Sequence, residues 1–150
     1  MTYYKDLTVC DYFPASAWRC RLIAVGWIEY GEPFEKGAVP AGVVEKLQAL
    51  RQEFAVFRSV VFRGLHSCSI CKPAGDARDS LAGSHVNLFI PHQGFVFVAP
   101  GRVDHYIEAH GYQPPESFVV SVLECPPPSS AEFREQIRVA NRGVEALLYD

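Results

Sequence analysis

Two cysteines and two histidines have the types and the spacing of a zinc site. Cys68 and Cys71 enclose two residues in CSIC, so both sulfurs can point at one ion. His105 and His110 follow in HYIEAH, and four residues lie between them, within the interval of about three to five seen in zinc fingers. The sequence therefore predicts one structural Zn²⁺ held by two thiolates and two imidazoles.

The spacing of the two histidines requires a local distortion of the helix. Five positions turn an ideal helix by about 140° beyond a full turn, so the two rings would not share a face. Gly111 directly follows His110 and would let the helix tighten and end there. The 33 residues between Cys71 and His105 exceed the interval in small zinc fingers. We therefore expect a β-hairpin between the two halves of the site.

Three other interpretations of these residues remain open. His66 or His85 could replace one of the helix histidines as a ligand. The cysteines could instead be buried thiols beside hydrogen-bonded histidines. A redox dithiol is the weakest alternative, because KPAG after Cys71 favours a loop, whereas a thioredoxin-like pair begins a helix.

A catalytic zinc site would need an open coordination position and a general base. Glu108 lies between the two histidines and could be that base in a small zinc hydrolase. The H-E-x-x-H and deaminase patterns are absent, as are the phosphate-binding glycine motifs. Four protein ligands close the site, which favours a structural role, and we predict no catalytic residue. His92 is interpreted as a solvated loop residue.

Composition and charge limit the possible partners and location. The 150 residues carry a formal charge of -3 with no basic cluster, which argues against nucleic acid. The sequence has neither an export signal nor eighteen consecutive apolar residues, so we expect no membrane association and a cytoplasmic location. Without export, the five cysteines favour metal chemistry over disulfides. Three of them are expected to be buried without a chemical role: Cys10, Cys20 and Cys125.

The elements before the CSIC knuckle alternate between strand and helix patterns. Residues 17–30 are rich in β-branched and aromatic side chains and predict a strand, although a helix broken at Gly26 is an alternative. A loop should follow over 31–37. A helix should begin at Pro40, with one apolar face. That face consists of Val43, Val44, Leu47 and Leu50. A second strand over 54–65 should run into the knuckle, and 72–84 should form an exposed loop.

The elements after the loop should be a hairpin and three helices. Short apolar runs at 86–90 and 95–98 flank PHQG and predict the hairpin. A helix from Pro100 should carry both histidines. The next helix should run from Pro114 to the CPPP sequence, with Phe118, Val119, Val122 and Leu123 on its apolar face. Ser129 and Glu132 have capping-box spacing for a last helix, whose apolar stripe is Phe133, Ile137, Val144, Leu147 and Leu148.

Aromatic residues are dense near the N-terminus. We interpret them as core in preference to a binding surface, because large aromatic side chains are usually buried. They are Tyr3, Tyr4, Tyr12, Trp18 and Trp27.

Several segments together resemble an uncharacterised bacterial domain family of about this length. They are YYKDLT, GLHSCSIC, the NLFIP and FVFVAP runs, HYIEAHGYQPPESF and VLECPP, which span 3–127. The most specific part is H-x-C-x-x-C paired with H-Y-x-x-x-H-x-Y-x-P-P. The resemblance implies one domain and a metal site, and it implies no activity.

These observations predict an α+β fold, with residues 1–150 forming a single domain. A small mixed sheet with packed helices would carry a zinc knuckle, a finger-like site embedded in a larger domain. The favoured function is a non-enzymatic protein-binding or accessory module, such as an immunity-type protein, whose partner is another protein. The alternative is the zinc hydrolase that uses Glu108.

Overall fold

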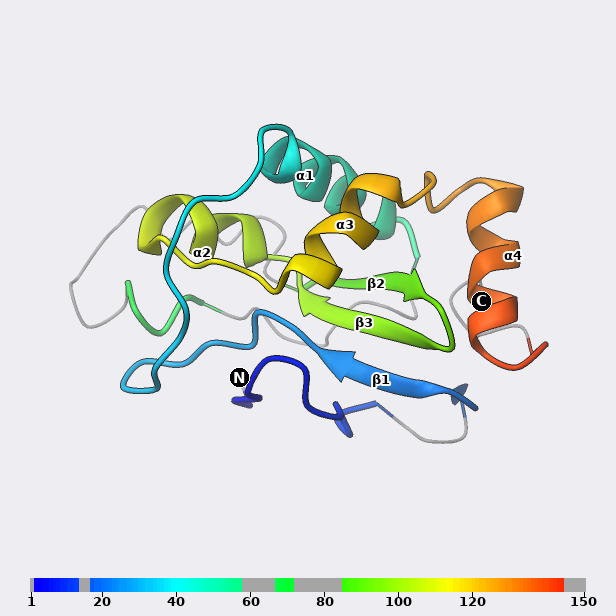
Figure 1. Ribbon diagram of the computed structural model, residues 1–150, viewed down its shortest axis with the longest axis horizontal. Coiled ribbons are helices and arrows are strands. Elements are labelled where there is room, and N and C mark those ends of the chain that lie inside the picture. The colour runs from blue at the N-terminus through cyan, green and yellow to red at the C-terminus, as the bar shows by residue number, and fades with distance from the viewer. Residues whose placement is uncertain (1, 14–16, 58–66, 72–84, 145–150) are drawn as a thin grey trace.

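Three strands form a small mixed sheet in the centre of the computed structural model (Figure 1). The structure describes residues 2–13, 17–57, 67–71 and 85–144. The strands are β1 (Arg21–Ala24), β2 (Asn87–His92) and β3 (Phe95–Pro100). Their order is β1-β3-β2, with β2 antiparallel and β1 parallel to β3. The predicted α+β class and mixed sheet are confirmed.

The predicted hairpin is present, with a shorter connection than PHQG. Pro91 and His92 belong to β2, so only Gln93 and Gly94 form the turn. Gly94 has a φ of 79°, a left-handed value that suits the second position of the turn and that glycine adopts without strain. Pro91 has no backbone N–H to donate to a neighbouring strand. It is tolerated in β2 because this strand lies at the edge of the sheet and pairs on one side only.

The N-terminal segment lies along the outer edge of β1. Val9 pairs with Ile23 in an antiparallel bridge, and the amide of Cys10 donates to the carbonyl of Leu22 at 2.8 Å. This covers an edge that would otherwise expose unpaired backbone groups. β1 is shorter than the predicted strand over 17–30, because Gly26 takes a φ of 76° and turns the chain.

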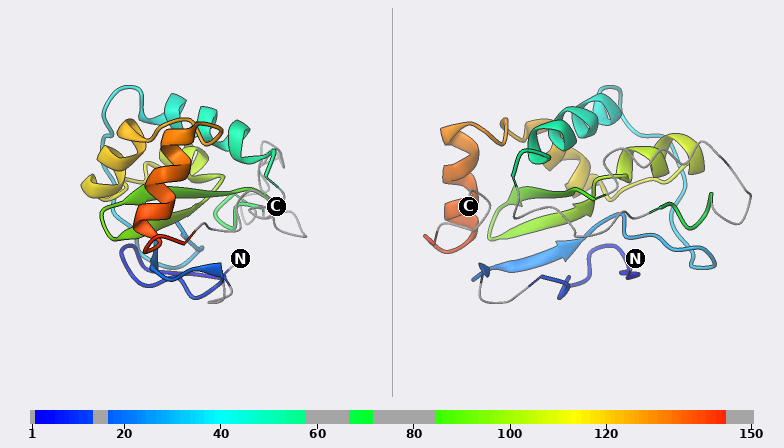
Figure 2. Two further views of the ribbon diagram at one scale, coloured as in Figure 1. Left: turned by 90° about the vertical axis from the view of Figure 1, so that its right-hand side faces the viewer. Right: turned by 180° about the vertical axis from the view of Figure 1, so that it is seen from behind.

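Three of the four helices in the described part of the chain, α1 (Val43–Phe54), α2 (Val103–His110) and α3 (Glu116–Glu124), lie on one side of the β2–β3 hairpin, whereas β1 and the N-terminal segment lie toward the other side (Figures 1 and 2). The fourth, α4 (Ala131–Ala140), stands beside the turn of the hairpin. Among the residues described, no helix is both long and apolar enough to cross a membrane.

The structure corrects several predicted boundaries. Phe54 is the last residue of α1 and is fully buried, so the predicted strand over 54–65 is wrong at its start. Residues 58–66 and the predicted loop over 72–84 lie outside the described part of the chain. Pro100 ends β3 and does not begin α2. Leu123 is exposed, so α3 buries a narrower face than predicted.

The N-cap of α4 lies one residue after the predicted cap. The Ser130 hydroxyl accepts a hydrogen bond from the amide of Phe133 at 3.1 Å, so Ser130 is the N-cap. Ser129 instead donates to Glu53 at 3.2 Å. The capping-box assignment is therefore wrong by one position. Val144 follows the helix, and residues 145–150, with the predicted Leu147 and Leu148, lie outside the described residues.

Replacing Ser130 with alanine should destabilise the protein by about 1 kcal/mol, because one amide at the start of α4 would lose its acceptor. The matched variant Ser129→Ala removes a hydroxyl from an exposed hydrogen bond and should change stability by less than about 0.5 kcal/mol. Urea denaturation of both variants measures the difference. Equal losses would show that Ser130 does not cap α4.

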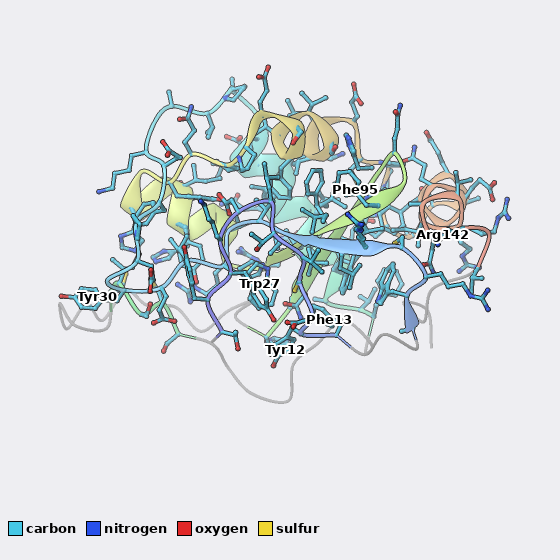
Figure 3. The ribbon with its side chains drawn as sticks, turned by 60° about the horizontal axis from the view of Figure 1, so that its bottom comes forward. Tyr12, Phe13, Trp27, Tyr30, Phe95 and Arg142 are labelled. Carbon is cyan, nitrogen blue, oxygen red and sulfur yellow. The ribbon has the colours of Figure 1, made fainter. Side chains whose placement is uncertain are left out.

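The N-terminal aromatic residues divide between core and surface. Trp27 is fully buried and donates from Nε1 to the carbonyl of Val98 at 2.9 Å. Figure 3 shows Tyr12 and Phe13 gathered beside it, with ring centroids 5.7 and 6.5 Å from the Trp27 ring. Tyr12 is exposed on its outer side. The core interpretation therefore holds for Trp27 and fails for Tyr12.

Candidate metal centre

An ion pair between two helices fixes the start of α2, the helix that carries both candidate histidines. Nη1 of Arg51 on α1 lies 2.6 Å from Oδ1 of Asp104 and also donates to the carbonyl of Gly101 at 3.0 Å. Asp104 is buried in the first turn of α2, where a carboxylate also complements the helix dipole. The sequence pattern did not identify this pair, because its two residues are 53 positions apart.

The end of α2 brings the two imidazoles together. His110 is the last residue of α2, and Gly111 adopts the predicted left-handed conformation with a φ of 67°. The amide of Tyr112 donates to the carbonyl of Tyr106 at 3.1 Å, beyond the regular helical ladder. The ring centroids of His105 and His110 are 5.1 Å apart although five positions separate them in the chain.

Residues 67–71 form a turn that presents both cysteines to α2. The amide of Cys71 points at Sγ of Cys68, 3.5 Å away, and both side chains are buried. Ser69 accepts a hydrogen bond from the amide of Tyr30 at 2.9 Å, which attaches the turn to the segment after β1. Both sulfurs are therefore held at the inner side of the turn. None of the five cysteines, all within the described ranges, forms a disulfide.

The four ligand atoms converge on one point. Sγ of Cys71 lies 3.3 Å from Nε2 of His105 and 3.4 Å from Nε2 of His110, and Sγ of Cys68 lies 3.4 Å from Nε2 of His110. All four atoms lie within 4.8 Å of one another. A zinc tetrahedron with ordinary bond lengths has sulfur-to-nitrogen edges of roughly 3.5 Å. The four side chains are therefore positioned to hold a metal ion.

Hydrogen bonds alone account poorly for this cluster. Nε2 of His110 faces both sulfurs, and a ring nitrogen offers only one proton or one lone pair in its plane. It cannot make a good hydrogen bond to each sulfur. A cation at the centre of the four atoms would attract all of them together, with the thiols deprotonated.

The family of the chain is shown by a match over most of its length. The model of the domain of unknown function DUF7919 matches residues 2–123. The chain belongs to the DUF7919 family. All four candidate ligands lie inside the match, whereas α4 lies beyond it. The match confirms that the chain belongs to an uncharacterised domain family, as the sequence resemblance predicted. The bacterial origin of that family stays a prediction. No curated protein and no solved structure matches the chain.

The alternative ligands and the candidate general base are not part of the four-residue cluster in the described part of the chain. His66 lies outside the described residues. His85 is half-buried and does not belong to the cluster that the described residues form. Glu108 is exposed, and its Oε1 lies 3.4 Å from Nε2 of Gln48 on α1. His92 is the last residue of β2, so its interpretation as a solvated loop residue is wrong.

A half-buried carboxylate is bonded to the residue that follows the end of α2 in this DUF7919 chain. Asp6 accepts a hydrogen bond from the Tyr112 hydroxyl at 2.7 Å and another from the amide of Gly26 at 2.9 Å. Burial raises the pKa of Asp6 and, together with the nearby Asp6 charge, raises the pKa of Tyr112 well above its usual range. The sequence pattern did not identify this network, because Asp6 and Tyr112 are 106 positions apart.

Asp6 should make the stability depend on pH in a definable direction. Its pKa in the folded protein is above 3.8, so the folded state holds the proton more tightly than the unfolded state. Its contribution is therefore fully present below pH 3.8 and is lost as the pH rises through the folded-state pKa. The unfolding free energy of the wild type minus that of Asp6→Asn should decrease with pH in this window. A difference that increases with pH would contradict the assignment.

Proposed function

We propose that Cys68, Cys71, His105 and His110 bind one Zn²⁺ as a structural site. The observation that supports this most strongly is the convergence of two sulfurs and two ring nitrogens at distances close to a zinc tetrahedron. The ion would tie the turn at residues 67–71 to α2, two segments separated by more than thirty residues.

Zinc is the metal that this ligand set fits best. Ca²⁺ and Mg²⁺ take oxygen ligands, and the four atoms include none. Iron–sulfur clusters are held mainly by four cysteines, whereas two thiolates with two imidazoles are typical of structural zinc. The two thiolates balance the charge of the ion, so its burial leaves no net charge in the centre.

We also propose that the domain acts by binding another protein in the cytoplasm, without catalysis. Four side chains fill a tetrahedral set, so the metal would keep no position for a reacting water. The hydrogen bond from Gln48 directs the Glu108 carboxylate toward α1. Tyr30, whose backbone is bonded to the turn at residues 67–71, is 65% exposed, and aromatic side chains of this kind are enriched in protein interfaces.

Cobalt substitution tests the ligand set directly. The protein refolded with Co²⁺ should show the intense visible bands of a tetrahedral ion together with a thiolate charge-transfer band. Replacing Cys68 with serine should weaken the charge-transfer band, and Glu108→Gln should leave the whole spectrum unchanged. A weak octahedral spectrum would overturn the structural site.

The Glu108→Gln variant also separates the two proposed functions. A protein-binding module should keep its fold, its metal and its partner when this exposed carboxylate is neutralised. A zinc-dependent hydrolytic activity that is present in the wild type and lost only in this variant would establish the hydrolase instead.

A further inference from the structure

A second candidate site lies at the opposite end of the sheet from the metal centre. The hairpin turn, α3 and α4 enclose a cavity of about 360 Å³, within the range of small-molecule sites. Figure 1 shows α4 beside the turn of β2 and β3, and residues of both line this cavity. Its lining comes from residues 91–94 of the hairpin, Val120, Ser121 and Glu124 of α3, and Glu135, Gln136, Val139 and Ala140 of α4.

A hydrogen-bonded pair fixes one polar side of this cavity. Nδ1 of His92 lies 2.8 Å from the hydroxyl of Ser121, which is 93% buried. The imidazole packs against the rings of Phe95 and Phe97, with centroids 4.7 and 5.3 Å away. The pair therefore has a defined orientation before any ligand enters, as a preformed site requires.

The walls of the cavity are apolar although they face solvent. Val120 on α3 is 45% exposed, and Val139 on α4 is 63% exposed. Both line the cavity together with Pro91 and Ala140. A ligand with a short hydrocarbon chain would cover apolar surface that the fold itself leaves in water.

The carboxylates of Glu124 and Glu135 line the cavity, and in the described part of the chain only that of Glu135 is paired with a basic side chain. Both oxygens of Glu135 accept hydrogen bonds from Arg138, at 2.7 and 2.8 Å. The Glu124 carboxylate makes no hydrogen bond or ion pair with any described residue. It is also the last residue of α3, where the helix dipole is negative and no basic side chain lies in the last turn. A carboxylate in this position is destabilising until a cation pairs with it.

We infer that this cavity binds a small organic cation, a primary amine with a short apolar chain. The ammonium would pair with Glu124 and the negative end of α3. The chain would lie between Val120 and Val139, toward the His92–Ser121 pair. The cavity and the metal centre share no residue, so this site stands independently of the proposed zinc function.

Titration with hexylamine, hexanol and hexanoate, followed by two-dimensional NMR, tests the inference. Hexylamine should shift the amide signals of Gly94, Val120 and Val139, whereas hexanol should bind at least about tenfold more weakly and hexanoate should not bind. Equal shifts with hexanol and hexylamine would overturn the role of charge. Binding of a lysine-containing peptide without binding of hexylamine would overturn the free amine as ligand.

Two exposed positions supply variants that should fold normally. Glu124→Gln should weaken hexylamine binding by about tenfold, because a charge-assisted contact is lost. The matched variant Glu45→Gln removes an exposed carboxylate from α1, which does not line the cavity, and should leave binding unchanged. Equal affinities for Glu124→Gln and the wild type would refute the site. Unchanged zinc content in Glu124→Gln would separate this result from any effect on the metal.

Discussion

Replacing Cys71 with serine should abolish zinc binding and lower the melting temperature by about 10 °C. The reason is that a metal which binds only the folded state adds its binding free energy to stability. At free zinc about 1,000 times above the Kd this amounts to about 4 kcal/mol, and each kcal/mol shifts the Tm of a domain of this size by about 2–4 °C. Differential scanning calorimetry with and without a chelator measures the effect.

The control for this variant is Cys10→Ser, the same chemical change at a similarly buried position. Cys10 is 4% exposed and Cys71 is 5% exposed, but Cys10 lies outside the metal cluster. The Tm of Cys10→Ser should fall less than that of Cys71→Ser, because the variant only places a hydroxyl in an apolar site. The chelator should still lower the Tm of Cys10→Ser. Equal Tm values for the two variants, with no chelator effect in either, would contradict the proposed site.

Replacing Gly26 with alanine should destabilise the protein by about 3 kcal/mol. Gly26 has a φ of 76°, which costs an L-residue roughly 1–2 kcal/mol. An added Cβ would also lie 2.8 Å from Cγ2 of Val103, so the first residue of α2 would have to move. Overpacking of this kind costs about 1–3 kcal/mol. Urea denaturation gives the free energy of unfolding.

Gly31→Ala separates the two contributions. Gly31 has a similar φ of 88°, but a Cβ there would meet no atom within 4 Å. This variant should therefore lose only the backbone contribution, about 1–2 kcal/mol. If Gly26→Ala costs no more than Gly31→Ala, then the close approach of Gly26 to Val103 does not constrain the position of α2.

The sequence predicted the elements whose signals are local. The hairpin follows from two apolar runs around a glycine turn, and the end of α2 follows from Gly111, whose φ is positive as expected. The four candidate metal residues were identified from spacing within CSIC and HYIEAH alone. Each of these signals lies within a few residues of the feature that it predicts.

Features that depend on distant residues were missed or misplaced. Phe54 has strong β propensity, but it completes the buried face of α1, so tertiary packing overrides propensity. Pro91 suggested a loop, yet an edge strand accommodates it. The pairs Arg51 with Asp104 and Asp6 with Tyr112 join segments far apart in the chain, and no pattern in one sequence links them.

Elemental analysis of the purified, untagged protein tests the central claim most directly. We expect one zinc per chain in the wild type and in Cys10→Ser, and none in Cys71→Ser or His105→Ala. Full zinc content in His105→Ala would exclude this ligand set. A wild-type protein without metal, in which the thiols of Cys68 and Cys71 both react readily with a thiol reagent, would contradict the claim that these residues form a zinc site.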